Sequence, residues 1–247
     1  LLINLDSLLE LLAIPKENIN LFSLRQSNRA KRLIFKPSIR NGFEIVLPRF
    51  YNDKWVLETV RKSKPKIVKL LTEIKEARTE LRPTSIILPF TGNTWEIIYR
   101  GTHDKYSDAI TETSTALEVP EKAEDLFGTP LVLQKWLHDK ALEYLPKHLH
   151  HVSIKLKLSY NKVRIKRQKT LWGSCSIKGN INLNRNLMLM PHEVVDYVLH
   201  HELIHLKVLS HSSKFWKELE RSFPDYQKSL AQLKYFGDNK IPEWALV

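Results

Sequence analysis

Residues 199–216, LHHELIHLKVLSHSSKFW, hold four of the chain's ten histidines around a single glutamate. Within this run, His201, Glu202 and His205 form the pattern H-E-x-x-H. On a helix, residues four apart point the same way, so both imidazoles can bind one metal ion. The carboxylate of Glu202 can then reach a water on that metal without being a ligand, as a general base requires. The pattern therefore predicts a metal centre with Glu202 as its catalytic residue.

His211 is the predicted third metal ligand. A catalytic zinc usually has three protein ligands and one open position for water. His211 lies six residues beyond His205, and a continuous helix would rotate by about 600° over that distance. We therefore expect the helix to end near Leu209-Ser210 and the chain to fold back toward the metal.

Several other polar residues compete for a place in this centre. Glu218 and Glu220, on the next expected helix, are alternative third ligands. On a helix, His200 points about 100° away from its neighbour in the motif, so we expect it outside the ligand set. His192 is expected in the first turn of the same helix. The histidines of residues 148–151, HLHH, are expected at a helix end, where they suit the dipole.

The segment before the metal motif is strongly basic. Between Val152 and His192 there are nine basic residues and no acid: Lys155, Lys157, Lys162, Arg164, Lys166, Arg167, Lys169, Lys178 and Arg185. One interpretation is a solvated strand face, because lysines commonly protect sheet edges. The other is an electropositive wall that attracts polyanions such as nucleotides or nucleic acid, with Arg167 and Lys169 contacting substrate.

Two short stretches connect the basic segment to the metal helix. In TLWGSCS, residues 170–176, Gly173 permits a tight turn or bulge near the site, and Cys175 is expected to be a buried thiol. NINLNRNL, residues 180–187, is predicted to be an edge strand to which an extended peptide could pair. Asn182 and Asn184 are therefore candidate substrate-binding residues.

Hydrophobic periodicity predicts an α+β protein. Strands are expected at 32–38 and 43–48, joined by a turn at Asn41-Gly42, and at 85–90, 94–100, 114–119, 153–160, 162–167 and 179–184. Helices are expected before Pro15 and at 53–78, with a break or bend at Pro65, and at 120–148, 191–209, 212–223 and 224–237. We expect two regions, 1–120 and 121–247, which could form one compact unit.

Composition narrows the class of protein. The 247 residues suffice for a substantial core. The single cysteine rules out an internal disulfide, and with no apparent signal peptide or membrane span it favours the cytoplasm. A net charge of +12 favours anionic partners.

The region from Thr170 to Trp216 resembles the YgjP-like metal-dependent hydrolases, which are also described as SprT-like or WLM-like zincin metallopeptidases. It contains their WGSCS turn, G-x-I-x-L-N strand, D-Y-V helix opening, H-E-L-x-H helix, and a further histidine before F-W. The resemblance is strong over 152–236. It implies zinc bound by His201, His205 and His211, with Glu202 as base or acid. It also implies a zincin-like C-terminal core, in which a small sheet lies beside the metal helix. The sequence pattern adds further helices after the metal helix and an N-terminal strand-helix-strand region before the core.

Three functions are compatible with these features. The first is a zinc-dependent metallopeptidase, in which Glu202 takes a proton from the attacking water and passes it to the leaving nitrogen. The second is a metal-dependent nucleoside triphosphate pyrophosphohydrolase, which the basic segment suits. The third is a nucleic-acid-associated module with a structural metal. The sequence leaves the substrate, the physiological metal and the oligomeric state open.

Overall fold

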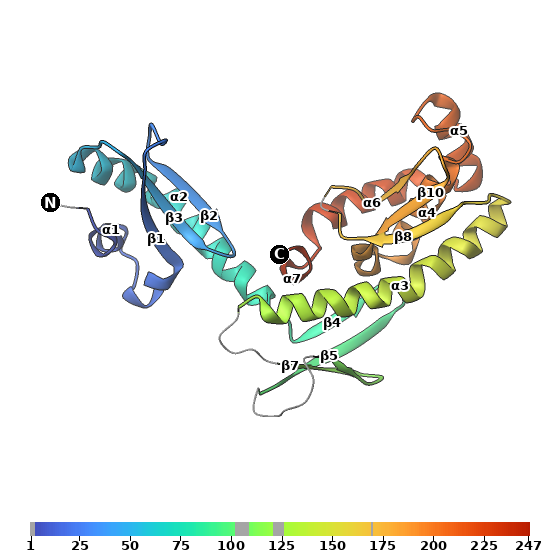
Figure 1. The fold of residues 1–247 in the computed structure, drawn as a ribbon, viewed down its shortest axis with the longest axis horizontal. Coiled ribbons are helices and arrows are strands. Elements are labelled where there is room, and N and C mark those ends of the chain that lie inside the picture. Colours follow the sequence, from blue (N-terminus) through green and yellow to red (C-terminus); the bar gives the residue numbers. More distant parts are fainter. Residues whose placement is uncertain (1–2, 102–108, 121–125, 169) are drawn as a thin grey trace. The chain divides into compact units, whose positions relative to one another are not determined.

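The computed structural model of the protein describes residues 3–101, 109–120, 126–168 and 170–247. The chain divides into two compact units, Leu1–Glu80 and Leu81–Val247 (Figure 1). Residues 81–120, which the sequence assigned to the N-terminal region, are thus grouped with the C-terminal unit. Both units combine helices with small sheets, which confirms the predicted α+β class.

The sheet of the N-terminal unit has the strand order β1-β3-β2. β1 is Phe22–Ser27, β2 is Ile34–Ser38 and β3 is Gly42–Pro48. β2 and β3 are antiparallel and form the predicted hairpin at Asn41-Gly42, whereas β1 runs parallel to β3. Gly42 has a φ of 74°, and a Cβ there would lie 2.2 Å from the carbonyl oxygen of Leu21. A residue with a side chain therefore does not fit this turn.

Among the described residues of the N-terminal unit, three helices accompany this sheet. They are α1 (Leu5–Leu12), the 3-10 helix η1 (Lys16–Leu21) and α2 (Asp53–Glu80). α1 is the helix predicted before Pro15, and the backbone N–H of Ser7 donates to Oδ1 of Asn4 at 2.8 Å to cap it. α2 does not break at Pro65. Because Pro65 is exposed, the carbonyl that loses its helical partner can bind water.

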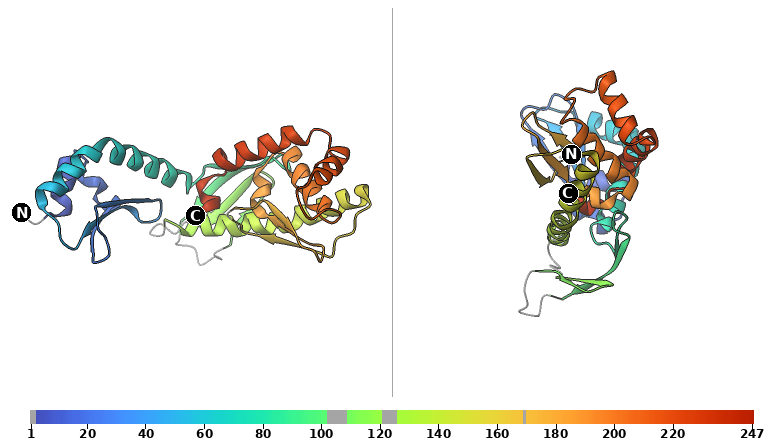
Figure 2. Two further views of the ribbon diagram at one scale, coloured as in Figure 1. Left: turned by 90° about the horizontal axis from the view of Figure 1, so that it is seen from above. Right: turned by 90° about the vertical axis from the view of Figure 1, so that its right-hand side faces the viewer.

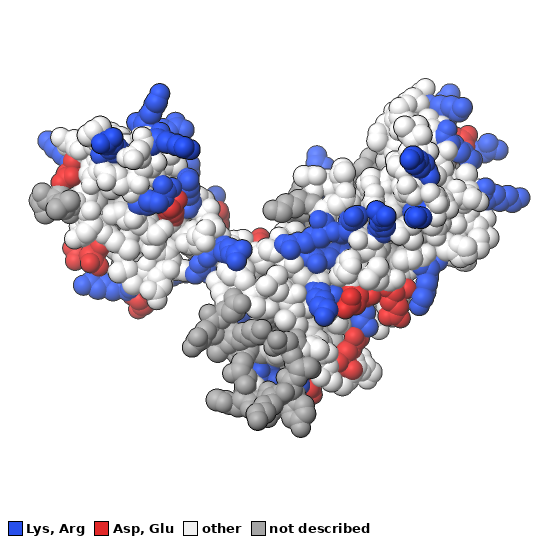
Figure 3. All heavy atoms as spheres, in the orientation of Figure 1, with Lys and Arg blue, Asp and Glu red and all other residues white. Residues whose placement is uncertain are grey.

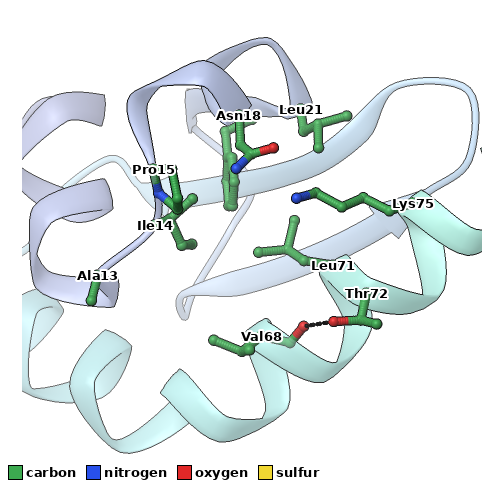
Figure 4. A pocket seen from close by; sticks show the side chains of 10 residues that line it. Ala13, Ile14, Pro15, Asn18, Leu21, Val68, Leu71, Thr72 and Lys75 are labelled. Carbon is green, nitrogen blue, oxygen red and sulfur yellow. Dashed lines mark hydrogen bonds between the residues drawn. The ribbon is translucent and has the colours of Figure 1, made fainter.

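A hollow of about 160 Å³ lies between α2 and the segment that joins α1 to η1 (Figure 4). Lys75 extends from α2 toward Asn18 of η1. The hydroxyl of Thr72 is already used, since it donates to the carbonyl oxygen of Val68 at 3.2 Å. The lining contains no acid and no histidine, so we assign no catalytic role to this hollow.

The C-terminal unit begins with a four-stranded sheet of order β4-β5-β7-β6. Its strands are β4 (Ser85–Leu88), β5 (Asn93–Arg100), β6 (Thr111–Glu112) and β7 (Ala116–Pro120), which confirms the strands predicted at 85–90, 94–100 and 114–119. The long helix α3 (Gly128–Leu156) packs against β7 (Figure 2). The rings of Trp95 and Trp136 meet edge to face at 5.3 Å in the core between them.

The strand predicted at 153–160 is wrong, because α3 continues to Leu156. Buried residues extend the helical spacing at Leu145, Leu149 and Val152. Lys157 then ends the helix in the left-handed conformation, with a φ of 55°. The histidines of residues 148–151 consequently lie inside α3 rather than at its end.

The second sheet of this unit has the order β8-β10-β9. β8 is Lys162–Lys166, β9 is Gly173–Cys175 and β10 is Asn180–Asn184. β10 is therefore the central strand, parallel to β8 and antiparallel to β9. The prediction that residues 180–187 form an edge strand is wrong, since both sides of β10 are paired. β9 is the edge strand on the side of the metal motif.

Four helices follow the second sheet, after the 3-10 helix η2 (Arg185–Leu189). They are α4 (His192–Ile204), α5 (Ser213–Ser222), α6 (Tyr226–Asn239) and α7 (Glu243–Leu246). The metal helix α4 begins where predicted but ends at Ile204, earlier than the Leu209-Ser210 that we expected. No helix in the described part of the chain is long and apolar enough to cross a membrane.

Candidate metal centre

Three imidazole rings meet at the C-terminal end of α4. Nε2 of His201 lies 3.2 Å from Nε2 of His205 and 2.9 Å from Nε2 of His211. One nitrogen from each of the three rings lies within 4.8 Å of the others. Four ligands placed tetrahedrally around zinc, at about 2.0–2.1 Å each, are roughly 3.3 Å apart. The observed separations are close to that value, so this donor set fits a zinc-type ion.

The early end of α4 brings His211 back to this point. His205 caps the C-terminal end of α4, and the N–H of Val208 donates to the carbonyl oxygen of Ile204 in the turn that follows. The indole N–H of Trp216 donates to the carbonyl oxygen of His211 at 3.0 Å, which fixes the loop to α5. The chain folds back as predicted, although it turns sooner.

The ring of Phe215, on α5, contacts all three imidazole rings. Its ring centroid lies 4.8 Å from that of His201, 4.6 Å from that of His205 and 4.9 Å from that of His211. Phe215 is fully buried, so these contacts have little room to shift. Rigid packing of this kind holds ligands in place before a metal binds.

Hydrogen bonds at the other ring nitrogens leave Nε2 available. Nδ1 of His205 lies 3.0 Å from the carbonyl oxygen of Val208, which can only accept, so Nδ1 carries the proton and Nε2 has a free lone pair. Nδ1 of His201 lies 3.4 Å from the hydroxyl of Tyr197. Burial, together with the neighbouring imidazoles, lowers the pKa of His201 to about 3. His201 is therefore neutral at physiological pH, as a metal ligand must be.

Glu202 follows His201 on α4 and is buried, with 5% of its surface exposed. Burial raises the pKa of its carboxyl group to about 8. Its Oε2 atom has no hydrogen-bond partner among the described residues, which is costly for a buried polar atom. A carboxylate in this situation is suited to accept a proton or to pair with a cation.

Gly173 of β9 gives Glu202 its space. A Cβ at position 173 would lie 2.5 Å from Oε1 of Glu202 and 2.7 Å from its Cγ. The sequence predicted a tight turn or bulge near the site at this glycine. The structure places it near the site, but as a strand residue that must lack a side chain because the carboxylate packs against its backbone.

Replacing Gly173 with alanine is expected to lower kcat by about 100-fold, because a displacement of about 1 Å at a catalytic group has effects of this size. Metal content should be unchanged, since Gly173 does not touch the three imidazoles among its close contacts. Gly101→Ala is the matched control, because a Cβ there meets no atom of the described residues within 4 Å. Full activity in Gly173→Ala would show that the position of Glu202 is not critical.

The structure describes three of the four predicted substrate-binding residues, Asn182, Asn184 and Arg167, and each of them makes hydrogen bonds within the protein. Both amide hydrogens of Asn184 are used, since Nδ2 donates to the carbonyl oxygens of Gln168 and Leu171 at 2.8 and 2.9 Å. Nδ2 of Asn182 donates to the hydroxyl of Ser174 at 3.0 Å, across the pair β10–β9. Asn184 is thus placed to hold a loop, and Asn182 to brace the edge strand.

Of the two basic candidates, the structure describes Arg167, and Lys169 lies outside the described residues. Arg167 is exposed and its guanidinium donates to the carbonyl oxygen of Val247. Lys162, Arg164 and Lys166 of β8 are all exposed, and basic side chains follow one another across this face (Figure 3). The alternation fits a solvated edge strand, the first of the two interpretations of this segment.

Cys175 is half-buried at the end of β9 and does not belong to the metal centre. Burial, and then the charge of Glu202, raise the pKa of its thiol from 9.0 to about 11. The thiolate fraction at pH 8 is therefore about one hundredth of that of an unshifted thiol.

Alkylation of Cys175 by iodoacetamide at pH 8 is accordingly expected to be about 100-fold slower in the native protein than in urea, since the thiolate is the nucleophile. Mass spectrometry of timed samples measures both rates. Equal rates would show that the thiol is neither buried nor influenced by Glu202.

The competing ligand candidates lie apart from the three rings. Oε2 of Glu218 pairs with Nζ of Lys207 at 3.2 Å, and in the described chain Glu220 does not join the histidine group either. His200 points away, as expected, but is buried: its Nδ1 lies 2.8 Å from the carbonyl oxygen of Asp196. His211 is thus the residue best placed to complete the ligand set.

An H-E-x-x-H helix whose histidines converge with a third histidine is typical of metal-dependent hydrolases. The family model described as YgjP-like, metallopeptidase domain, matches residues 31–236, and the chain belongs to this family. At the level of the family, a metal cofactor and a peptide substrate follow. The match confirms the resemblance seen in the sequence.

Solved structures of two metallopeptidase zymogens are also similar to the chain. Abylysin of Pyrococcus abyssi is 29% identical, with 39% of this chain and 95% of that chain covered and a TM-score of 0.34. Jannalysin of Methanocaldococcus jannaschii is 26% identical over 38% of this chain and 95% of that chain, also with a TM-score of 0.34. No curated protein matches.

Proposed function

We propose that the protein is a zinc-dependent metallopeptidase in which His201, His205 and His211 hold the metal. The observation that carries the proposal is the convergence of three Nε2 atoms beside a buried carboxylate oxygen that lacks a partner among the described residues. Three imidazoles leave one position of a tetrahedral zinc open, which is typical of a catalytic site. When bound, zinc lowers the pKa of water and polarises a carbonyl group.

Glu202 is the proposed general base and then the general acid. Its free Oε2 accepts the proton of the attacking water and later delivers it to the leaving nitrogen. The buried position raises its pKa to about 8, whereas a cation held by the histidines would stabilise the carboxylate and lower that pKa. These opposing effects keep the group near the pH at which proton transfer in both directions is efficient.

The peptide is proposed to bind along β9, which replaces the predicted binding along residues 180–187. β9 pairs with β10 on one side only and ends its sheet. Its first residue, Gly173, touches Glu202. An extended peptide that paired with the outer side of β9 would run past the proposed catalytic carboxylate.

The experiment is a substrate screen with the zinc-loaded protein. We expect cleavage of casein or of fluorogenic peptides, and no cleavage by the Glu202→Gln variant at the same zinc content. Release of pyrophosphate from nucleoside triphosphates without peptide cleavage would contradict the proposal and select the nucleotide hydrolase. Zinc binding together with salt-sensitive DNA binding, but no hydrolysis of any substrate, would select the structural module.

A further inference from the structure

A second group of potential ligands lies at the opposite end of α4. Nε2 of His148 lies 2.5 Å from Oδ1 of Asp196, and Nδ1 of His192 lies 3.4 Å from Oδ2 of the same residue. The rings of His148 and His192 meet edge to face at 4.9 Å. One ligand atom from each of the three residues lies within 4.8 Å of the others, which is the same criterion that the catalytic histidines meet.

Two helices build this group. His192 and Asp196 are four residues apart on α4, so their side chains lie on one face, the same spacing that joins His201 to His205. His148 comes from α3, which packs against α4. His192 is nine residues before His201, or about 13 Å along the helix axis. The two groups are therefore separate sites on one helix.

We propose that His148, His192 and Asp196 bind a second zinc-type divalent cation, which links α3 to the catalytic helix α4. Two imidazoles and one carboxylate are ligands that zinc and its neighbours in the first transition row prefer. The carboxylate also offsets one of the two positive charges of the ion. Side chains of 20%, 49% and 25% relative exposure for His148, His192 and Asp196 leave the group accessible to an ion from solvent.

The surroundings provide a supported and open site. The ring of Phe90 stacks on His192 at 5.3 Å and meets His148 edge to face at 5.3 Å, so it restricts both imidazoles. A hollow of about 450 Å³ adjoins the group and leaves room for water as a further ligand. His151 also lines this hollow, one turn further along α3 than His148. Lys147, the cation in the lining, is drawn toward Glu143, with Nζ and Oε1 3.9 Å apart.

Zinc stoichiometry tests the second site independently of catalysis. After equilibrium dialysis against zinc, elemental analysis is expected to find two zinc ions in the native protein and one in His192→Ala. His205→Ala/His211→Ala should retain one, and His150→Ala, which removes an exposed histidine of α3 outside the group, should retain two. Peptidase activity of His192→Ala should be unchanged.

If His148, His192 and Asp196 only form hydrogen bonds with one another and bind no metal, the zinc stoichiometry will differ from these values. If the native protein binds one zinc, and His205→Ala/His211→Ala binds none, the second site is overturned and the catalytic proposal stands. If the single zinc is lost in His192→Ala instead, the catalytic proposal is overturned. Asp196→Asn serves where His192→Ala fails to fold, because it keeps the side-chain shape and removes the charge. Two zinc ions in both His192→Ala and Asp196→Asn would also overturn the second site.

Thermal unfolding provides a second measurement. Zinc is expected to raise the Tm of His205→Ala/His211→Ala by several degrees, because an ion that binds only the folded state stabilises it. Adding Asp196→Asn to that variant should remove the increase. An increase that persists in the triple variant would contradict the link between α3 and α4.

Discussion

Glu202→Gln is expected to lower kcat by about three to four orders of magnitude, the upper range for loss of a general acid–base residue. Glutamine matches glutamate in shape but cannot accept the proton from the attacking water. Its amide also fits the space that Gly173 leaves beside the carboxylate. Steady-state kinetics on a cleaved peptide, with zinc content measured on the same samples, separates this loss from loss of the metal.

The matched control is Glu193→Gln, which makes the same change on an exposed residue in the first turn of α4. It should retain full activity, because Glu193 lies at the other end of the helix from His201, Glu202 and His205. Glu202→Gln protein that keeps both its zinc and its full activity would rule out Glu202 as the base.

His211→Ala is expected to have the second-largest effect, a fall in both zinc affinity and activity. Loss of a residue that merely supports a ligand costs about 10–100-fold in metal affinity, and loss of a ligand itself should cost more. His211 lies exposed in the loop before α5, so its replacement leaves no cavity in the core. Competition with a zinc chelator measures the affinity of the catalytic site.

His150→Ala is the control for this change, because it also removes an exposed histidine and leaves the three Nε2 atoms intact. It should bind zinc as tightly as the native protein. If His211→Ala keeps native affinity and activity, a different third ligand is required, and Glu218 would have to leave Lys207 to supply it.

The sequence predicted the convergence of the three imidazoles because the signals for it are local. H-E-x-x-H needs only the helical repeat to place two imidazoles together, and α4 provides it. The return of His211 followed from one geometric argument, that a continuous helix would carry it away. The hairpin at Asn41-Gly42 also depends on neighbouring residues alone.

The wrong secondary-structure predictions concern segments whose packing or pairing partners are distant in sequence. Residues 153–156 alternate polar and apolar side chains like a strand, but the buried Leu145 and Leu149 extend the helical face of α3 into them. β10 is central because β8, which precedes β9 in sequence, pairs parallel with it on the side opposite to β9. β9 is therefore an edge strand. A single sequence does not reveal which strand becomes central.

The environment of the centre was also beyond reach from sequence. In the sequence, Phe215 has the pattern of an ordinary core residue. Its contact with the three histidine rings cannot be predicted from that pattern. The tight contact of Gly173 with Glu202 joins two segments that are adjacent only in the fold. For the same reason the sequence placed His148 and His192 separately, at helix ends, whereas α3 and α4 bring them together.

The most direct test is an anomalous difference map at the zinc edge from crystals of the zinc-loaded protein. If zinc binds the three histidines, we expect a peak about 2.0–2.1 Å from Nε2 of each of His201, His205 and His211. Zinc bound to the protein with no peak between these three nitrogens would contradict it.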